Sequence, residues 1–308
     1  MPRACCAFVS GFARDLPPAH GTSGILSAMS REPEPTTGRT PPRVGVVTGA
    51  AGTIGALVVD RLVGAGAVVV AADVDEGGVG GLVERHGSSV VPVAADLTDP
   101  GGIDAVVEAV ERLGRVDVLV NNAGIVVITP FAEVSTGELE RELDLNYRLP
   151  LVLTHRLYPH LARSRGVVVT VASLGAFVPL AESPGYSGSK AGLRMLMAAL
   201  ARSTSATGVR VAVVNPSSVD TAMLRHEAAG GGSPLNFLGT PMPPERVADA
   251  VLDAVTGRRR RVERDLPRGE GVLVRVASLT PGVSRRVLPL LTGLGERGRR
   301  RYLARSKG

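Results

Sequence analysis

Tyr186 and Lys190 stand four residues apart in the run PGYSGSKAGL and are the residues with the clearest potential for chemistry. If this stretch is helical, both side chains project from one face. A free tyrosine has a pKa of about 10 and is a poor base at neutral pH, but a nearby cation favours the phenolate and lowers that pKa. The pair could therefore exchange the proton of an alcohol or ketone, although the spacing alone is more often that of a solvated helix face.

Short runs rich in valine alternate with segments of helix length from Arg43 to about Thr256. Apolar runs of this length are typical of strands that are buried on both faces, and the alternation is that of a parallel sheet. The sequence therefore predicts an α/β fold, a doubly wound parallel sheet flanked by helices. The runs lie at 44–47, 68–70, 118–120, 167–171 and 209–214.

The first predicted strand leads through the glycine turn TGAAGTIG into a helical stretch. Glycines in this place let the backbone approach a pyrophosphate at the positive N-terminus of the helix, as in a Rossmann-type fold. The second strand ends at Asp73, eighteen residues after Gly55. An acid in that place hydrogen-bonds the adenosine ribose and repels a 2′-phosphate. With no basic residue in the turn, we expect NAD to be bound in preference to NADP.

Four further segments complete a resemblance to the short-chain dehydrogenase/reductase family, in its compact single-domain branch. They are DLT with Asp96, NNAG at 121–124, LNY with Asn146 and VAS with Ser173. Together with the glycine turn and the Tyr186 segment they extend the resemblance over about residues 43–225. The resemblance implies an NAD-dependent enzyme that interconverts a secondary alcohol and a ketone by hydride transfer.

The resemblance also implies a role for each matching residue. Tyr186 would be the general acid/base, and Lys190 would lower its pKa and bind the nicotinamide ribose. Ser173 would donate to the carbonyl oxygen, and Asn146 would kink its helix and hold a water that links Lys190 to solvent. No metal site is expected. The implied cofactor contacts are Gly49, Gly52, Thr53, Ile54, Gly55, Asp73, Asp96, Leu97, Asn122, Ala123, Gly124, Tyr186, Lys190, Pro216, Val219 and Thr221.

Two positions depart from the pattern of the compact branch. Thr53 replaces its central glycine, and the spacing of Gly49, Gly52 and Gly55 is typical of the extended branch, which includes sugar-nucleotide epimerases. NNAG and the short C-terminal region favour the compact branch. Thr53 either weakens the backbone approach or contributes a hydroxyl to a phosphate. Ser217 stands where a glycine is usual, so the turn after the sixth strand is expected to differ if it needs a positive φ.

The substrate is expected to be hydrophobic, such as a lipid-like, steroid or terpenoid alcohol. This expectation rests on the apolar residues around the predicted pocket, whereas Glu182, near the tyrosine, could instead select a polar group. The Pro- and Gly-dense segment 229–244 is either a mobile lid or a passive surface loop. The apolar residues are Leu174, Phe177, Val178, Leu180, Met223 and Leu224.

The basic residues gather at the C-terminus, where 257–308 holds fifteen Arg or Lys against four acids. The rest of the chain is mildly acidic, so the overall charge does not indicate nucleic-acid binding. We expect a basic edge strand followed by an amphipathic helical tail that is interrupted at Pro281 and Pro289. The tail could lie on an anionic membrane surface, fold over the substrate cleft or a partner subunit, or be a solvated end.

The predicted organisation is a disordered leader at 1–42, a catalytic domain at 43–256 and the tail at 257–308. Met29 would make an equally sensible start, so 1–28 could lie outside the translated chain. Cys5 and Cys6 are adjacent, which excludes a disulfide framework. No apolar run reaches the roughly 18 residues of a membrane span, so we expect a cytoplasmic protein with peripheral membrane contact through the tail as an option.

Three alternative hypotheses describe the function of the protein and its partners. The resemblance implies a homo-oligomer, either a dimer or a tetramer, acting on a small-molecule alcohol or ketone without nucleic acid. A non-catalytic member of the fold that senses NAD or serves as a scaffold is a second hypothesis. An adaptor that acts at a membrane surface through the tail is a third.

Overall fold

The computed structural model describes residues 43–257 and 262–305. The leader predicted at 1–42 lies outside the described residues, as do the arginines at 258–261. The described residues belong to one compact unit. Within them, no helix is both long and apolar enough to cross a membrane.

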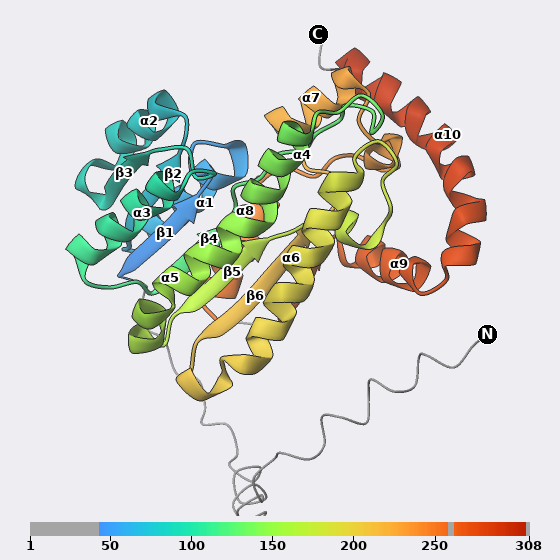
Figure 1. Cartoon of the computed structure of the whole chain (residues 1–308). Helices are drawn as coiled ribbons and strands as arrows, with labels where there is room; N and C mark the ends of the chain where they lie inside the picture. Colours follow the sequence, from blue (N-terminus) through green and yellow to red (C-terminus); the bar gives the residue numbers. More distant parts are fainter. Residues whose placement is uncertain (1–42, 258–261, 306–308) are drawn as a thin grey trace, which may run out of the picture. The chain divides into compact units, whose positions relative to one another are not determined.

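A parallel sheet forms the centre of the described chain, with seven strands in the order β3-β2-β1-β4-β5-β6-β7 (Figure 1). Valine dominates most of the strands because β-branched side chains restrict the backbone to extended conformations and pack well on a pleated surface. β1, β4 and β5 are buried along their whole length. The strands are β1 Val44–Thr48, β2 Val68–Asp73, β3 Val90–Ala94, β4 Val118–Asn121, β5 Val167–Val171, β6 Arg210–Pro216 and β7 Glu263–Leu266.

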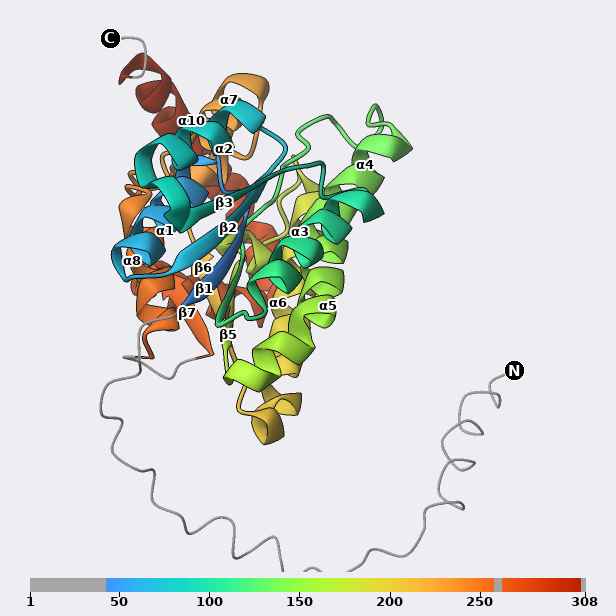
Figure 2. The same cartoon turned by 90° about the vertical axis from the view of Figure 1, so that its left-hand side faces the viewer.

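Helices cover both faces of the sheet (Figure 2). α1, α2 and α8 bury their apolar sides on one face, and α3, α5 and α6 bury theirs on the other. This arrangement confirms the predicted doubly wound α/β fold. The bounds are α1 Thr53–Gly64, α2 Glu76–His86, α3 Pro100–Leu113, α4 Thr136–Leu143, α5 Leu149–Ser164, α6 Pro184–Ser203, α7 Ala222–Gly230 and α8 Glu245–Val255.

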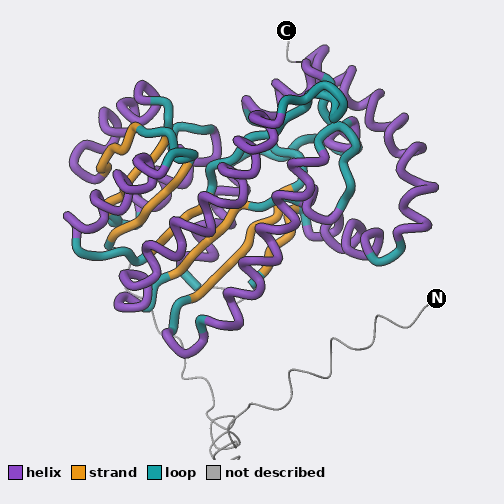
Figure 3. The backbone as a smooth tube through the Cα atoms, viewed as in Figure 1, coloured by secondary structure: helices purple, strands orange, loops and turns teal. Residues whose placement is uncertain are grey.

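The strand order reverses at β1, which pairs with β2 on one side and β4 on the other. Figure 3 shows the strands running side by side with helices connecting them. In such sheets a crevice opens beyond the carboxyl ends of the strands at the reversal. The glycine turn follows β1, NNAG begins in the last residue of β4, and Ser173 follows β5. The topology therefore brings the three motifs to one edge of the sheet.

The C-terminal region adds an edge strand to the sheet and continues in two helices. β7 pairs in parallel with β6, and α9 (Arg268–Ser278) and α10 (Pro281–Arg305) follow it. α10 runs through Pro289, so the predicted interruption there was wrong. Pro289 is exposed, and its missing N–H removes one hydrogen bond without ending the helix. Pro281 is the first residue of α10, a position that proline tolerates.

The segment predicted as a lid or a passive loop is packed beneath α10. It contains the end of α7 and a 3-10 turn, Pro234–Phe237. A Cβ at Gly295 or Gly298 would collide with the carbonyl oxygens of Pro234 and Phe237, so only glycine permits this approach. The rings of Phe237 and Tyr302 lie 5.3 Å apart. The segment 229–244 therefore joins α7 to α10, a structural role that neither the lid nor the passive-loop hypothesis included.

Candidate active site

The glycine turn between β1 and α1 is shaped by close backbone contacts. Gly49 has a φ of +65°, and a Cβ there would lie 2.8 Å from the Cα of Ala123. A Cβ at Gly55 would overlap the carbonyl oxygen of Gly49. Gly52 precedes α1 with an ordinary φ of −67°, and no side chain caps the helix. The N–H groups of the first turn, beginning at Thr53, are therefore available to an anion at the positive end of the helix.

The two acids predicted to contact the adenosine half of the cofactor follow β2 and β3. Asp73 accepts hydrogen bonds from the backbone N–H of Ala51 at 2.9 Å and of Asp75 at 3.1 Å, which fixes it beside the glycine turn. Asp96 accepts from the N–H and hydroxyl of Thr98, at 2.9 and 2.7 Å. These bonds hold the pKa of Asp96 below its usual value. Leu97, next to it, is buried.

NNAG connects the glycine turn to the residues that are predicted to be catalytic. The hydroxyl of Thr48 accepts from the backbone N–H groups of Asn122 and Ala123, each at 3.1 Å, and the Asn122 amide donates to the Gly49 carbonyl at 3.0 Å. A Cβ at Gly124 would lie 2.9 Å from the Asn146 amide oxygen and 3.0 Å from the Lys190 ammonium. Glycine therefore permits these two side chains to approach the β4 loop.

Asn146 lies in a π-helical turn, Asp144–Arg148, between α4 and α5. It is fully buried, and its amide oxygen accepts from the N–H of Ile125 at 2.9 Å. Its amide nitrogen donates to the carbonyl of Ile125 at 2.9 Å and to the hydroxyl of Ser189 at 3.1 Å. Both ends of the amide are thus engaged by protein, so Asn146 ties the β4 loop to α6.

Ser173, Tyr186 and Lys190 meet at the start of α6. The Ser173 hydroxyl accepts from the N–H of Gly175 at 2.9 Å. A Cβ at Gly175 would lie 3.2 Å from that hydroxyl and 3.3 Å from the Tyr186 ring, so this glycine lies against both groups. The Lys190 ammonium is 5.8 Å from the centre of the Tyr186 ring. The i, i+4 spacing therefore places the phenol and the ammonium near each other, as expected.

The pKa of Tyr186 differs from the sequence-based expectation. Burial raises it to about 12, and the nearby hydroxyl of Ser173 only partly opposes that change. Burial also lowers the pKa of Lys190 to about 8, against the opposing charge of Glu142. The net direction of the Tyr186 pKa in the protein alone is therefore opposite to the lowering that was expected from Lys190. Burial disfavours the phenolate and the ammonium together, which weakens the cation that would stabilise the phenolate.

Glu142 of α4 is a residue that the sequence analysis missed. It is fully buried, and one carboxyl oxygen accepts from the N–H of Val127 at 2.8 Å. The other has no hydrogen-bond partner among the described residues and lies against Gly185, where a Cβ would collide with it. Burial raises the pKa of Glu142, and the charge of Lys190 opposes this. In the polar run TGELEREL nothing distinguishes Glu142 from its neighbours, and only the packing of α4 on α6 does so.

A cavity of about 960 Å³ extends from these residues towards α9 and α10. All six predicted apolar pocket residues line it, whereas Glu182 does not. Asn146 lies outside its wall. The predicted site residues that line it are Ile54, Asn122, Gly124, Ser173, Tyr186, Lys190, Pro216, Val219 and Thr221.

The C-terminal helices supply much of the cavity wall. Leu273 and Val276 of α9 and Val287, Leu288 and Leu291 of α10 line it. Among the three alternatives for the tail, this placement corresponds to folding over the cleft.

α9 is held in place by a charged cluster. Arg275 forms an ion pair with Asp265 of β7 at 2.6 Å. Arg275 and Arg194 both stack on Phe177, with guanidinium carbons 4.5 and 4.2 Å from the ring centre. Phe177 itself lines the cavity. The contacts that fix α9 therefore also fix part of the cavity wall.

The turn after β6 accepts serine without strain. The N–H of Ser217 donates to the carbonyl of Leu266 at 2.7 Å. Among the described residues other than glycine, only Arg165 has a positive φ, so Ser217 has an ordinary conformation. Val219 forms a parallel bridge with Met242, and the Thr221 hydroxyl caps α7 by accepting from the N–H of Leu224 at 3.3 Å.

Glu227 of α7 is a second acid that the sequence analysis missed. It lines the cavity, and its carboxylate accepts a hydrogen bond from the Asn236 amide at 2.8 Å. Burial raises the pKa of Glu227 to about 7.

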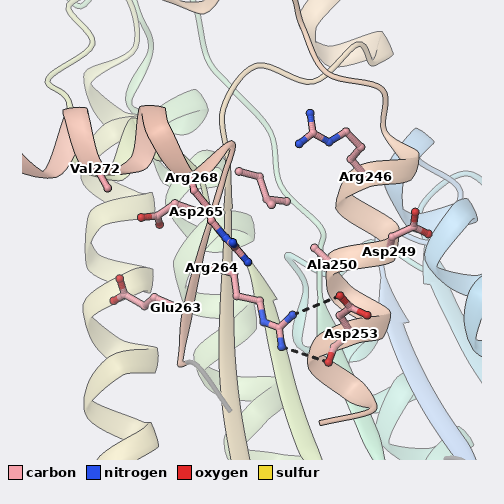
Figure 4. Close-up of a pocket in the computed structure, with 10 residues that line it drawn as sticks. Arg246, Asp249, Ala250, Asp253, Glu263, Arg264, Asp265, Arg268 and Val272 are labelled. Atoms are coloured by element: carbon pink, nitrogen blue, oxygen red, sulfur yellow. Dashed lines mark hydrogen bonds and ion pairs between the residues drawn. The ribbon is translucent and has the colours of Figure 1, made fainter. Parts of the chain in front are cut away.

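A second pocket, of about 470 Å³, lies between α8 and β7 (Figure 4). Arg264 crosses it and donates to the carbonyl of Asp253 at 3.3 Å. None of the predicted site residues lines this pocket. The chemistry implied by the motifs therefore belongs to the larger cavity.

The fold and the site together define an α/β oxidoreductase with a dinucleotide-binding turn at the reversal of its sheet. The model of the short chain dehydrogenase family matches residues 43–230, more than half of the chain. The chain therefore belongs to the short-chain dehydrogenase family and is an enzyme that acts on CH–OH groups, which confirms the resemblance.

Two relatives illustrate the range of the family around this chain. It is 37% identical over 227 residues to 1-deoxy-11-beta-hydroxypentalenate dehydrogenase of Streptomyces avermitilis, covering 71% of this chain and 83% of that protein. It is 32% identical over 230 residues to 3-beta-hydroxysteroid dehydrogenase of Comamonas testosteroni, covering 70% of this chain and 89% of that protein.

Solved structures share the fold. A short-chain dehydrogenase from Streptomyces avermitilis matches with a TM-score of 0.68 at 26% identity, covering 80% of this chain and 95% of that one. The 3-ketoacyl-(acyl-carrier-protein) reductase from Brucella melitensis, in complex with NADH, matches with a TM-score of 0.65 at 28% identity. It covers 72% of this chain and 96% of that one.

Proposed function

We propose that this enzyme interconverts a secondary alcohol and a ketone on a hydrophobic substrate, with NAD as cofactor and Tyr186 as general acid/base. The observation that carries the proposal is the mainly apolar cavity of about 960 Å³, whose wall includes Ser173, Tyr186 and Lys190. A hydroxyl, a phenol and an ammonium in one wall can bind a substrate oxygen and move its proton, while the apolar remainder can contact an apolar skeleton.

Each polar residue has a distinct part in the proposed reaction. Ser173 donates a hydrogen bond to the substrate oxygen, and Tyr186 gives that oxygen its proton in ketone reduction and removes it in alcohol oxidation. A Tyr186 pKa of about 12 keeps the phenol protonated at neutral pH, which suits donation to a ketone. Lys190 holds the cofactor ribose. NAD, when bound, supplies or accepts the hydride at its nicotinamide ring.

The preference for NAD rests on the acid at the end of β2. Asp73 is fixed beside the glycine turn by two backbone N–H groups, and an acid there hydrogen-bonds ribose hydroxyls and repels a 2′-phosphate. The glycine turn itself fits a pyrophosphate, because Gly49 and Gly55 leave no room for side chains and α1 has no side-chain cap. The complex of the Brucella melitensis reductase with NADH supports the same choice.

The apolar cavity wall and the two relatives both support the proposed substrate class. The printed names of those relatives describe a hydroxypentalenate and a hydroxysteroid as their substrates. We infer that this enzyme likewise takes an alcohol on a fused-ring, largely apolar skeleton.

The test is a panel of cyclic alcohols and ketones, followed by the absorbance of NADH and in parallel of NADPH. Tyr186→Phe is expected to lower kcat by at least about 100-fold, since general acid/base catalysis contributes that much. Absence of turnover by the unmodified enzyme above the Tyr186→Phe level would contradict the proposed reaction. A preference for NADPH would contradict the role of Asp73.

A peripheral contact with an anionic membrane is a second proposal, supported by the outer surfaces of α9 and α10. Leu290 and Leu294 of α10 are 72% and 54% exposed, and Leu279, in the turn between α9 and α10, is 81% exposed. This is an unusual accumulation of exposed leucine in one region. The sequence 257–308 also carries fifteen basic residues against four acids. Apolar residues beside basic ones are typical of helices that lie in a membrane interface.

This second proposal is tested with vesicles on the full-length chain, because α10 packs on the body and its removal would open the cavity. Leu279→Glu with Leu290→Glu should reduce co-sedimentation with phosphatidylserine vesicles. Phe131→Glu is the control, since Phe131 is 69% exposed in the α4 region of the chain. Equal binding by the unmodified protein, the double leucine variant and Phe131→Glu would contradict a membrane contact through α9 and α10.

A further inference from the structure

Glu227 is an acid placed inside a mainly apolar cavity. Its side chain belongs to the last turns of α7, the residue is only 9% exposed, and it contributes to the wall that also contains Tyr186. The negative charge of Glu227 contributes to the raised pKa of Tyr186, which lines the same cavity. A carboxyl group in such surroundings is costly unless it is paired, so its presence requires an explanation.

The protein satisfies only part of the hydrogen-bonding capacity of Glu227. The Asn236 amide donates to Oε2 at 2.8 Å, but no hydrogen bond to Oε1 is found among the described residues. No ion pair of the described chain includes Glu227, and Lys190 is the only cation among the cavity-lining residues. A carboxylate can accept about four hydrogen bonds, so Glu227 retains acceptor capacity for a ligand.

The position of this carboxyl is fixed by elements that are distant in sequence. Asn236 belongs to the 3-10 turn Pro234–Phe237, against which Gly295 and Gly298 bring the backbone of α10. Tyr302 of α10 also donates to Asp220 at 2.7 Å, just before α7 begins. α7, the turn and α10 are thus joined around Glu227. A side chain whose partner is held this firmly is preorganised for recognition.

We propose that Glu227 binds a second hydroxyl of the substrate, remote from the carbon that Tyr186 serves, so that the enzyme selects a hydroxylated alcohol over its monohydroxyl analogue. This inference rests on the proposed function and names the substrate class within it. A hydroxyl fits better than a carboxylate, which the ionised acid would repel. It also fits better than an ammonium group, whose burial among apolar walls is more costly.

The same geometry corrects the expectation for Glu182. That residue was the candidate for selecting a polar group, but it does not line the cavity. Glu182 therefore provides a matched control, because it is an acid in the same part of the molecule without access to the proposed site.

The experiment compares kcat/KM for matched pairs of probes in the full-length enzyme. The pairs are cyclohexanol with cyclohexane-1,4-diol, 2-decalol with decalin-2,6-diol, and androstan-3-ol with androstane-3,17-diol. For the pairs that are turned over, the unmodified enzyme should prefer the diol. Glu227→Leu should reduce that preference by about 10-fold or more, because a hydrogen bond to a charged group is lost. Glu227→Gln, which still offers an amide oxygen, should retain part of it, and Glu182→Gln should leave it unchanged.

Asn236→Ala tests the positioning of the acid. It should reduce the diol preference by a smaller factor, mainly through KM, because the carboxyl remains present but is less fixed. Thermal unfolding of each variant separates loss of recognition from loss of folding, and Glu227→Gln supplies the test if Glu227→Leu does not fold.

The outcomes distinguish this inference from the proposed function. If the unmodified enzyme turns over none of the probes, the proposed function fails. If it turns over both members of a pair and neither Glu227 variant alters their ratio, the assignment of Glu227 is overturned while the proposed function stands. An equal loss of preference in Glu182→Gln would also overturn it.

Discussion

The two halves of the crevice are formed by different kinds of contact. On the side of β1 to β3, close backbone contacts at Gly49 and Gly55 form the cofactor turn within one short stretch of chain. On the side of β5 to β7, the cavity wall includes side chains from α6, α7, α9 and α10, elements that are far apart in the sequence. The first half depends on space for the backbone, and the second depends on how distant helices pack.

The acids of the two halves differ in the same way. Asp96 is hydrogen-bonded by Thr98 and has a lowered pKa, whereas Glu227 lies in an apolar wall and has a pKa raised to about 7. Glu142 is buried with one unpaired oxygen and also has a raised pKa. Asp96 is therefore satisfied by the protein, whereas Glu142 and Glu227 keep unused acceptor capacity.

The largest effect is expected from Gly55→Ala. The new methyl group would overlap the Gly49 carbonyl, so the turn must move and NADH binding should fall by at least about 100-fold, the scale of a few kcal/mol. Titration of NADH fluorescence measures this. Gly64→Ala in the same helix is the control, because nothing lies within 4 Å of its Cβ and alanine favours helix by about 1 kcal/mol. Unchanged NADH binding in Gly55→Ala would contradict the inference that close backbone contacts in this turn shape the cofactor site.

The next effect concerns the dependence of stability on pH. A pKa of about 7 for Glu227, against the ordinary glutamate value of 4.5, means that the folded protein binds more protons between these values. The free energy of unfolding should therefore fall as pH rises from about 4.5 to about 7, by roughly 3 kcal/mol. Glu227→Gln should remove this part of the slope. Urea unfolding across the window measures both proteins, and parallel curves would show that Glu227 is not shielded from water.

Gly298→Ala should impair the substrate half of the crevice and leave the cofactor half unchanged. Its methyl group would collide with the Phe237 carbonyl and displace α10, at a cost of about 2 kcal/mol in stability. Because α10 lines the substrate cavity, kcat/KM for the alcohol should fall while NADH affinity stays close to its original value. Gly293→Ala is the matched control in α10, since its Cβ would meet nothing within 4 Å. An equal loss of NADH affinity would contradict the division of the crevice.

The smallest effect is expected from Glu142→Gln. The charge of Glu142 opposes the lowering of the Lys190 pKa, so its removal should move the part of the pH–rate profile that reflects Lys190 to lower pH. The shift should be below about one pH unit, because burial is the main cause of the lowered pKa. The profile of kcat/KM measures it. A shift to higher pH would show that Glu142 does not act on Lys190 as a negative charge.

The sequence by itself determined the sheet, the path of the glycine turn and the proximity of Tyr186 and Lys190, because each depends on residues that are neighbours along the chain. Valine runs predict buried strands, the positions of Gly49 and Gly55 fix a local backbone path, and Tyr186 and Lys190 share a helix face by their spacing alone. The edge strand β7 was also expected, from the family resemblance.

Only the tertiary structure decided the rest, for reasons of packing. Glu142 and Glu227 look like ordinary helix-surface acids in the sequence, and Glu182 appeared the better candidate because it is nearer to Tyr186 along the chain. Packing of α4 on α6, and of α10 on the turn at Pro234–Phe237, buries the first two and gives Glu227 access to the cavity. The raised pKa of Tyr186 has the same origin, since desolvation depends on every segment that covers a group.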